Sequence, residues 1–587
     1  MKILLQRRSV IYALLVLVIL IGLPLRMQNI KLNAYISDDA WWHYRHIEEV
    51  LKYGHRLNPD IYEFTTLNRP MTYPPLFHYL VAYSYRLFSR WFSLVRFTHY
   101  FNIFEAVLYL LFIYLFSYKF TKDRLFSLIG TLSASVSYGM IIRARAGELM
   151  PFVPGDLFAL GGILILLYQL EYMVNRAQPA PQHDNKGGHS ELQDEKSFLL
   201  TLSAGILLGL SLLSWSGGVL IYLPLIPAVF FSLGIARPKL IRKSIGLFVF
   251  CLVSILLISF PWYFPLISKY GLNPHSQEMH WFMKDFTVLH QIKPLGLYIM
   301  TSGSAIFFLP LVFLNTIYRS LKKEPLDIFL TFWIILGVVA TYSGWRGYVA
   351  VVPIIAAITM SVGASRTARF LFKERKTNIT WVFIFLFLLV GGIGYYISES
   401  NISPLDQERL GELRSNIESI RMLQYLRENY PAAITIDHIT WVSEDEAVGG
   451  LRMVAGQYLE YLPQGASEVF KDVSRFYLSG EEAAYKICKK YNVRLAIFRK
   501  HFLQLPQLSI LFSPPEIKSD EYIKISRLRP NSLDMRLDFT AKGRETMLFK
   551  MINRMQMKNF ELIYSSQGKE DPLPQLAVYK VNEPARQ

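Results

Sequence analysis

The chain has 587 residues, of which 52% are hydrophobic, 14% aromatic and only 18% charged. This composition is too apolar for a soluble chain of such length and predicts a multi-span membrane protein with a polar appendage. The net charge of +17 does not indicate a nucleic-acid partner, because many basic residues lie in short clusters between apolar runs. Only two cysteines occur, Cys251 and Cys488, which excludes a disulfide framework.

The N-terminus carries Lys2, Arg7 and Arg8, followed by an apolar run at residues 10–27. Because that run is long and lacks a small-x-small cleavage pattern, we expect an uncleaved first helix rather than a signal peptide. Further runs that are long enough to span a bilayer follow in chain order. These runs are 100–118, 124–142, 153–174, 198–214, 217–235, 244–264, 295–317, 326–344, 347–364 and 379–397.

The stretch 74–92 has a short apolar core that is broken by Arg86 and Arg90, so we expect it to lie at the membrane interface or to re-enter. When this stretch is not counted as a span, the basic clusters at 237–243, 319–323 and 366–376 all face the cytoplasm, as the positive-inside rule requires. The sequence therefore predicts a multi-pass protein of the cell membrane, with a cytoplasmic N-terminus and an extracytoplasmic C-terminal region.

Residues 1–399 are expected to form the transmembrane domain, with a first extracytoplasmic loop at 28–99. A polar stretch at 175–197 is expected to be a disordered cytoplasmic loop. Residues 400–587 are expected to form an extracytoplasmic soluble domain, and their alternating patterns predict a mixed α/β fold. The patterns are helical near 408–429 and 481–490, and strand-like at 433–436 and 493–498.

The first outer loop contains the adjacent acids Asp38 and Asp39, followed by Ala-Trp-Trp-His-Tyr and then Arg45. Carboxylates in such a place can hold a divalent metal or accept a proton. The same residues also suit a solvated helix start, with Ser37 or Asp38 as the cap and acids favoured by the helix dipole. The residue pattern alone leaves both interpretations open.

Three further loops carry acids, bases and histidines, and the predicted topology places them on the same side of the membrane as the first. Carboxylates there suit a divalent metal and arginines suit phosphate, which predicts an enzyme acting on a phosphate or diphosphate carried by a lipid. A single arginine at a helix end, such as Arg143, can instead be a snorkelling residue. The residues of interest are Arg145, Glu148 and Asp156 in the second loop, His290 and Lys293 in the third, and Arg346 in the fourth.

Several segments resemble the catalytic subunits of oligosaccharyltransferases. Asp39–Arg45 (DAWWHYR) is similar to the family's first-loop motif, in which an aspartate precedes aromatic residues and an arginine. Further similarities occur in the same order along the chain and cover most of it. They are 73–77 (YPPLF), 143–147 (RARAG), a degenerate TIxE loop at 287–290 (TVLH), Arg346, and a helix-strand unit at 477–494 that is similar to archaeal members.

This resemblance implies a polytopic α-helical membrane protein of the GT-C type, with about 11–13 transmembrane helices and a C-terminal extracytoplasmic mixed α/β domain. It implies transfer of a glycan from a polyprenyl (di)phosphate to an asparagine, with a divalent metal, Mg or Mn. Asp39 would be a metal ligand, with Glu148 or Asp156 as the second. Arg346, helped by Arg145 or Lys293, would bind the donor phosphate.

Two departures from the family pattern concern the acceptor. His290 stands where the family has the glutamate of TIxE, and it could contact the acceptor or act as a second base. The WWDYG motif that reads the sequon hydroxyl is absent, and the nearest segment is 441–445 (WVSED). The donor end of the family's site is therefore expected to be kept, and the acceptor end to be changed.

The leading hypothesis is a membrane-embedded glycosyltransferase that uses a polyprenyl-linked glycan and a protein or lipid acceptor, without a nucleic-acid partner. One alternative is a GT-C transferase acting on a lipid or cell-wall glycan. Another is a non-enzymatic relative with an eroded metal site. A transporter is disfavoured, because the predicted spans contain few ionisable groups of the kind an ion path needs.

Overall fold

The structure is a computed structural model that describes residues 8–67, 69–176, 191–215, 222–271, 298, 301–341, 351–371, 376–437, 442–456, 462–499, 521–527, 535–567 and 574–582. The described residues fall into two compact units. The membrane unit holds those within Met1–Tyr35, Tyr73–Ser268 and Leu289–Asp406. The sheet unit holds those within Ile36–Thr72, Lys269–Val288 and Gln407–Gln587.

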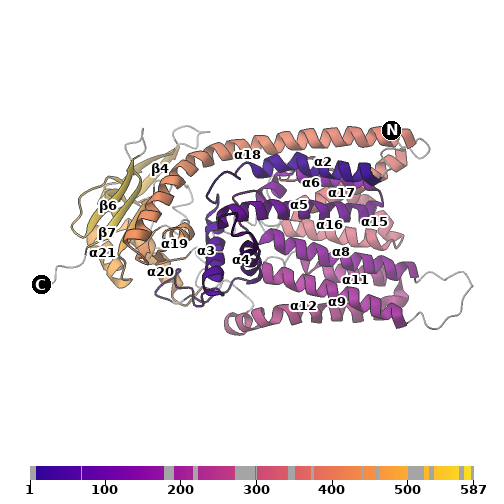
Figure 1. The fold of residues 1–587 in the computed structure, drawn as a ribbon, viewed down its shortest axis with the longest axis horizontal. Helices are drawn as coiled ribbons and strands as arrows, with labels where there is room; N and C mark the ends of the chain where they lie inside the picture. Colours follow the sequence, from indigo (N-terminus) through magenta and orange to yellow (C-terminus); the bar gives the residue numbers. More distant parts are fainter. Residues whose placement is uncertain are drawn as a thin grey trace, which may run out of the picture. The chain divides into compact units, whose positions relative to one another are not determined.

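The membrane unit is a bundle of helices (Figure 1). Its helices are α2 (Arg8–Met27), α4 (Leu76–Phe88), α5 (Leu94–Thr121), α6 (Arg124–Ser135), α7 (Tyr138–Arg143), α8 (Phe152–Arg176), α9 (Glu191–Ser214), α11 (Leu225–Ala236), α12 (Ile241–Tyr270), α15 (Phe308–Leu321), α16 (Pro325–Thr341), α17 (Val352–Leu371) and the first part of α18 (Lys376–Asn429). Short 3-10 turns occur at Pro238–Leu240 and Gly303–Phe307.

Six helices of the described chain are long and apolar enough to cross a membrane, and three shorter apolar helices accompany them. Every apolar run named above overlaps a helix, and the fold class predicted from the sequence is confirmed. The run 124–142 differs in detail, because α6 ends at Ser135 and α7 begins only at Tyr138. The stretch 74–92 forms the 13-residue α4, which is too short to span a bilayer.

Small residues bring the helices of this bundle close together. The backbone N–H of Gly130 on α6 donates to Ser361 Oγ on α17 at 3.0 Å. A Cβ atom at Gly162 on α8 would lie 2.9 Å from Leu208 Cγ on α9. Close approach at small residues is the usual way in which helices associate in a membrane, where apolar surface alone provides no preference for protein over lipid.

The sheet unit is built around a five-stranded mixed sheet with the strand order β2-β1-β3-β7-β6, and it also contains a two-stranded sheet, β4-β5. Its strands are β1 (Ile434–Ile436), β2 (Arg452–Met453), β3 (Leu495–Arg499), β4 (Ile523–Arg527), β5 (Met535–Phe539), β6 (Phe560–Gln567) and β7 (Pro574–Val581). Its helices are α3 (Asp38–Tyr53), the end of α18, α19 (Val442–Ala447), α20 (Ala466–Leu478), α21 (Glu481–Lys490) and α23 (Met547–Ile552), with a 3-10 turn at Gly543–Glu545.

The central strand β3 is buried along its whole length because helices cover both faces of the sheet (Figure 1). Ala496 and Phe498 point into one apolar core, which includes residues of α20, α21 and α23. Leu495 and Ile497 point into a second core, which includes residues of α18 and α19. This alternation is what the two-residue period of a strand requires.

The sheet unit contains three elements that the sequence predicts well. The predicted helix at 481–490 is α21, and the predicted strands at 433–436 and 493–498 match β1 and β3. The helical pattern near 408–429 is not a separate helix, since α18 continues without a break for 54 residues. The segment Ile36–Thr72 of the first loop clusters with the C-terminal region, a grouping that no local sequence pattern indicates.

Candidate active site

The first-loop motif forms α3, and its acids occupy the first turn of that helix. Ser37 precedes the helix in an extended conformation, and Asp38 and Asp39 follow it, where the helix dipole favours negative charge. Gly54 ends the helix at a φ of +80°, a left-handed conformation that glycine adopts without strain. The local sequence therefore contains both signals that define this helix.

Asp38 joins the start of α3 to the start of α19. Its carboxylate accepts the backbone N–H of Glu444 at 2.9 Å and that of Ser443 at 3.4 Å. Burial, with the neighbouring carboxylates of Glu444 and Asp39, raises the pKa of Asp38 well above its usual value. The side chain of Asp38 is thus used in a structural contact, and the half-buried Asp39 beside it is the better candidate for substrate chemistry.

Arg45, further along α3, is the centre of a buried ion network. Its Nη1 lies 2.8 Å from Glu49 Oε1, its Nη2 2.7 Å from Asp60 Oδ2, and its Nε 3.1 Å from Glu446 Oε2. Burial alone would lower the pKa of Arg45, but the surrounding carboxylates, with Asp60 the strongest, raise it above its usual value. The network fixes α3, the loop after it and α19 to one another.

A second buried arginine, Arg499 at the end of β3, binds α19 from within the sheet unit. Its Nε donates to Asp437 Oδ2 at 2.9 Å and its Nη1 to Glu444 Oε2 at 3.1 Å. Its Nη2 also pairs with Asp445. The acids of the segment 441–445, the nearest counterpart to the family's sequon-reading motif, are therefore held by an arginine of their own chain.

Two histidines of α3 lie beside this network. His46 Nδ1 is 2.9 Å from Glu49 Oε2, and its ring contacts that of Trp42 with 4.1 Å between centroids. Burial lowers the pKa of both His43 and His46 well below the usual value, and nearby positive groups lower it further. Both rings are therefore neutral at pH 7.

The candidate residues of the second loop lie in the membrane unit and form two ion pairs. Asp156 Oδ2 is 2.7 Å from Arg143 Nη2 and accepts the Tyr109 hydroxyl at 2.8 Å. Arg145 Nη2 is 3.3 Å from Glu148 Oε1. Both acids are paired, but Asp156 has the shorter contacts, to Arg143 and Tyr109, and Glu148 the longer one, to Arg145, which makes Glu148 the better candidate of the two for a metal ligand.

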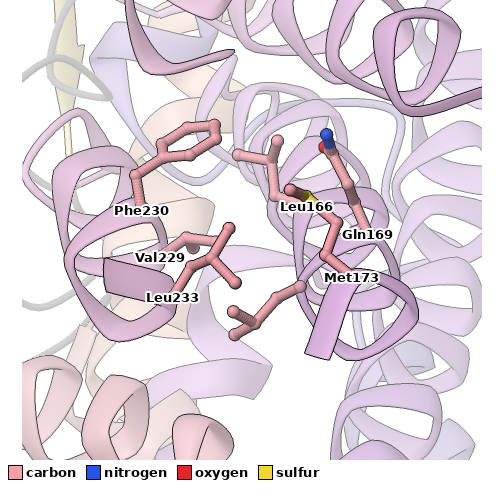
Figure 2. A pocket seen from close by; sticks show the side chains of 7 residues that line it. Leu166, Gln169, Met173, Val229, Phe230 and Leu233 are labelled. Carbon is pink, nitrogen blue, oxygen red and sulfur yellow. The ribbon is translucent and has the colours of Figure 1, made fainter. Parts of the chain in front are cut away.

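A small cavity between α8 and α11 is the hollow of the membrane unit shown in Figure 2. Gln169 is the one polar residue of its lining, and its Nε2 donates to Thr201 Oγ1 at 2.8 Å. Six of the seven side chains around this hollow are apolar, and they cannot satisfy the hydroxyls of a glycan or the oxygens of a diphosphate. They are Leu166, Leu170, Met173, Val229, Phe230 and Leu233.

The structure locates four of the predicted site residues. It places Asp39 in the sheet unit and Arg145, Glu148 and Asp156 in the membrane unit. Arg346, His290 and Lys293 lie outside the described residues. Within the described ranges no cluster of three or more metal-binding side chains occurs, so the metal ligands remain predictions.

Sequence reasoning missed the structural partners of α3. Asp60 follows Arg45 by 15 residues and Glu446 lies far from it along the chain, and neither belongs to a motif of recognisable spacing. The same is true of Arg499, which binds α19. The only available signal was the unusual run of three acids at 444–446, a few residues after a predicted strand. Such a run in a segment that becomes buried requires positive partners.

The bundle of apolar helices followed by a mixed α/β unit defines a polytopic membrane protein of the GT-C type. A crystal structure of the Archaeoglobus fulgidus oligosaccharyltransferase, tethered to an acceptor peptide with an NVT sequon, has this fold. The two chains match with a TM-score of 0.69 and 16% sequence identity, and the match covers 96% of this chain and 80% of the Archaeoglobus fulgidus chain. The archaeal oligosaccharyltransferase AglB from the same organism, in complex with an inhibitory peptide and dolichol-phosphate, has a TM-score of 0.68 at 15% identity, covering 95% and 79%.

The family model "Oligosaccharyl transferase STT3, N-terminal" matches residues 11–296 of this chain. Dolichyl-phosphooligosaccharide-protein glycotransferase 2 of Archaeoglobus fulgidus is 26% identical over 181 residues, which are 27% of this chain and 30% of that relative. The matched region is thus less than a third of the relative's length. The family model, the curated relative and the solved structures thus confirm the similarity to oligosaccharyltransferase catalytic subunits that the sequence motifs predict.

Proposed function

We propose that this protein is a membrane glycosyltransferase that transfers a glycan from a polyprenyl (di)phosphate donor to an acceptor, with a protein asparagine as the leading acceptor. The family supports the donor and the reaction, since its members named above act on protein from a dolichyl-linked oligosaccharide or were solved with dolichol-phosphate and peptide. One observation carries the proposal for this chain. Asp39 stands in the first turn of a helix that Asp38 and Arg45 hold firmly in the sheet unit.

A divalent metal, Mg or Mn, is proposed as the cofactor. The donors available are carboxylate oxygens, which both of these ions prefer. Asp39 is the candidate in the sheet unit; in the membrane unit Glu148 is preferred over Asp156, because its contact with Arg145 is longer than those of Asp156 with Arg143 and Tyr109. When bound, such an ion would offset negative charge on the leaving phosphate. A related archaeal oligosaccharyltransferase was solved in complex with Zn and sulfate, which supports a metal-binding family.

The remaining roles rest on the sequence resemblance. Arg346, with Arg145 or Lys293, is proposed to bind the donor phosphate, because a guanidinium matches the geometry of phosphate oxygens. His290 is proposed as an acceptor contact or second base. In the transfer, the bond between the anomeric carbon and the donor phosphate oxygen would break and a bond to the acceptor would form, with the acceptor's proton passing to a base, for which Asp39 and His290 are the candidates.

Acceptor recognition is proposed to differ from that of the family. The acids of α19 are buried and bound by Arg45 and Arg499, so they stabilise the sheet unit rather than read a hydroxyl group. A different surface must therefore select the acceptor, and a lipid or cell-wall glycan remains the alternative acceptor. The second alternative, a non-enzymatic relative, requires that Asp39 has no chemical role.

The cell membrane is the proposed location. We also propose that the N-terminus is cytoplasmic and the sheet unit extracytoplasmic, because only this orientation places the basic clusters between spans on the inner side. Attachment of a membrane-impermeant maleimide to a cysteine introduced at exposed Lys486, in intact cells, tests this orientation. Modification supports it, whereas modification only after lysis contradicts it.

The function is tested by following radiolabelled glycan from the host's polyprenyl-linked donors, in membranes with and without this protein. Two peptides that differ only in Asn-x-Thr against Gln-x-Thr are offered beside host lipid extract, with manganese or with chelator. Label on the Asn peptide alone, dependent on manganese, is the expected result. Label only in the lipid fraction would mean that the acceptor is a lipid rather than a protein asparagine. Absence of label from all fractions would favour the non-enzymatic alternative.

A further inference from the structure

The end of α4 and the beginning of α5 form an exposed surface that the reaction proposed above does not use. We call it the elbow and define it by Arg86, Leu87, Arg90, Trp91, Arg96 and Tyr100. Leu87 is 73% exposed, Trp91 67% and Tyr100 47%, and all three arginines are exposed as well. The elbow therefore combines large apolar side chains with positive charge on one short segment.

The elbow is an ordered turn rather than a loose loop. The Tyr85 hydroxyl donates to the carbonyl of Phe92 at 3.2 Å, and the backbone N–H of Trp91 donates to the carbonyl of Phe88 at 2.9 Å. Phe88 stacks on Phe97 with 5.7 Å between ring centroids, which ties the end of α4 to α5. Trp91 is thus held outward by the fold around it.

The charge of the elbow is not balanced by acids nearby in the chain. No aspartate or glutamate occurs between Glu63 and Glu105, and this stretch includes all three arginines of the elbow. In the part of the chain that the structure describes, Arg86 lies over the Tyr83 ring at 5.1 Å, and no ion pair with a carboxylate involves Arg86, Arg90 or Arg96. The elbow therefore presents a net positive charge of three guanidinium groups.

The position of the elbow explains which partner fits it. It lies where α5, a helix long and apolar enough to cross a membrane, begins, at one end of the bundle (Figure 1). Tryptophan and tyrosine concentrate at that level, where their rings lie among lipid headgroups. Arginine binds phosphate oxygens through paired N–H groups, and its stem can pack on apolar surface.

We propose that the elbow binds anionic phospholipid headgroups of the bilayer leaflet in which α5 begins. Leu87 and Trp91 enter the interfacial layer, and Arg86, Arg90 and Arg96 bind the headgroup phosphates. The proposed topology places this segment outside, where the positive-inside rule disfavours arginine. Binding to headgroup phosphates accounts for three arginines at such a position. The inference does not depend on glycosyltransferase activity.

Selective lipid binding is measured by energy transfer in vesicles of phosphatidylcholine with one-fifth phosphatidylglycerol. The full chain carries Ser89→Cys, an exposed position between Arg86 and Arg90, with a donor dye; the native Cys251 and Cys488 are buried. Trace acceptor lipid is labelled in the acyl chain and is either phosphatidylglycerol or phosphatidylcholine. We expect about fivefold enrichment of the phosphatidylglycerol probe near the dye, and a loss of this enrichment at high salt.

Three variants on this background decide the outcome. R86Q/R90Q/R96Q should abolish the enrichment, and R86K/R90K/R96K should retain it because the charge remains. The matched control K239Q/R242Q/K243Q removes three exposed bases elsewhere in the same unit and should leave the enrichment unchanged. Equal energy transfer to both lipid probes in the protein with all three arginines would overturn the proposal. Enrichment that remains in R86Q/R90Q/R96Q would overturn it as well.

Discussion

Arg45 on α3 and Glu446 on α19 form a buried ion pair, with 3.1 Å between Nε and Oε2. The guanidinium is shared with Glu49 and Asp60, so one side chain connects three segments of the sheet unit. The arginine of the first-loop motif therefore has a structural role, because it fixes the helix on which Asp39 stands.

Replacing Arg45 with methionine should destabilise the sheet unit strongly. Methionine keeps the apolar stem but leaves the carboxylates of Glu49, Asp60 and Glu446 buried without their cation, which costs about 3–5 kcal/mol of unfolding free energy. Denaturant or thermal unfolding of the purified protein measures this loss. Arg475→Met is the control, since Arg475 is 39% exposed and its ion pairs contribute about 0–1 kcal/mol. Equal effects of the two substitutions would contradict the role assigned to Arg45.

Substitutions in the second loop separate a metal ligand from a structural acid. Glu148→Gln should raise the manganese concentration for half-maximal glycan transfer about tenfold or more, with a smaller loss of thermal stability than Asp156→Asn, because the contact of Glu148 with Arg145 is the longer one. Asp156→Asn should instead lower thermal stability, because Arg143 loses its buried carboxylate partner. Manganese titration and thermal unfolding are measured on both variants. A changed manganese requirement in Asp156→Asn, with Glu148→Gln unaffected, would reverse the assignment.

Acidification should destabilise the sheet unit through its buried histidines. The pKa of His46 in the folded protein lies below the value of about 6.5 for an unfolded chain, so the unfolded chain binds more protons between the two values. The free energy of unfolding therefore falls as the pH drops through about 6.5, and this contribution is fully present above it. His46→Gln should make stability less dependent on pH than it is in the parent protein, because one group that takes up a proton on unfolding is removed.

Thermal unfolding at about one pH unit above and one below that value measures the difference. His55→Gln is the control, because the His55 side chain is exposed. Parallel pH profiles for His46→Gln and the parent protein would show that protonation of His46 is not coupled to folding.

The membrane unit could be predicted from sequence more fully than the sheet unit or the site. A run of apolar residues determines a helix locally, and α21 with its acidic start and basic end is likewise a local pattern. The pairing of Arg45 with Glu446, and of Arg499 with Asp437, depends instead on how distant segments pack. The pairing of Asp156 with Arg143 shows the same limit at shorter range, since an acid near the start of an apolar helix suits a metal and an arginine equally well.

The most direct test of the central claim is glycan transfer by Asp39→Asn in the presence of manganese. The substitution keeps the size of the side chain and removes the charge that a metal needs. Glu48→Gln, on the same helix with its carboxylate bound to the Tyr44 hydroxyl, is the control. We predict that Asp39→Asn lowers the transfer rate about a hundredfold or more, that the control stays near the parent rate, and that chelator abolishes transfer by the parent protein. Full activity of Asp39→Asn, or undiminished transfer by the parent protein in chelator, would contradict the account.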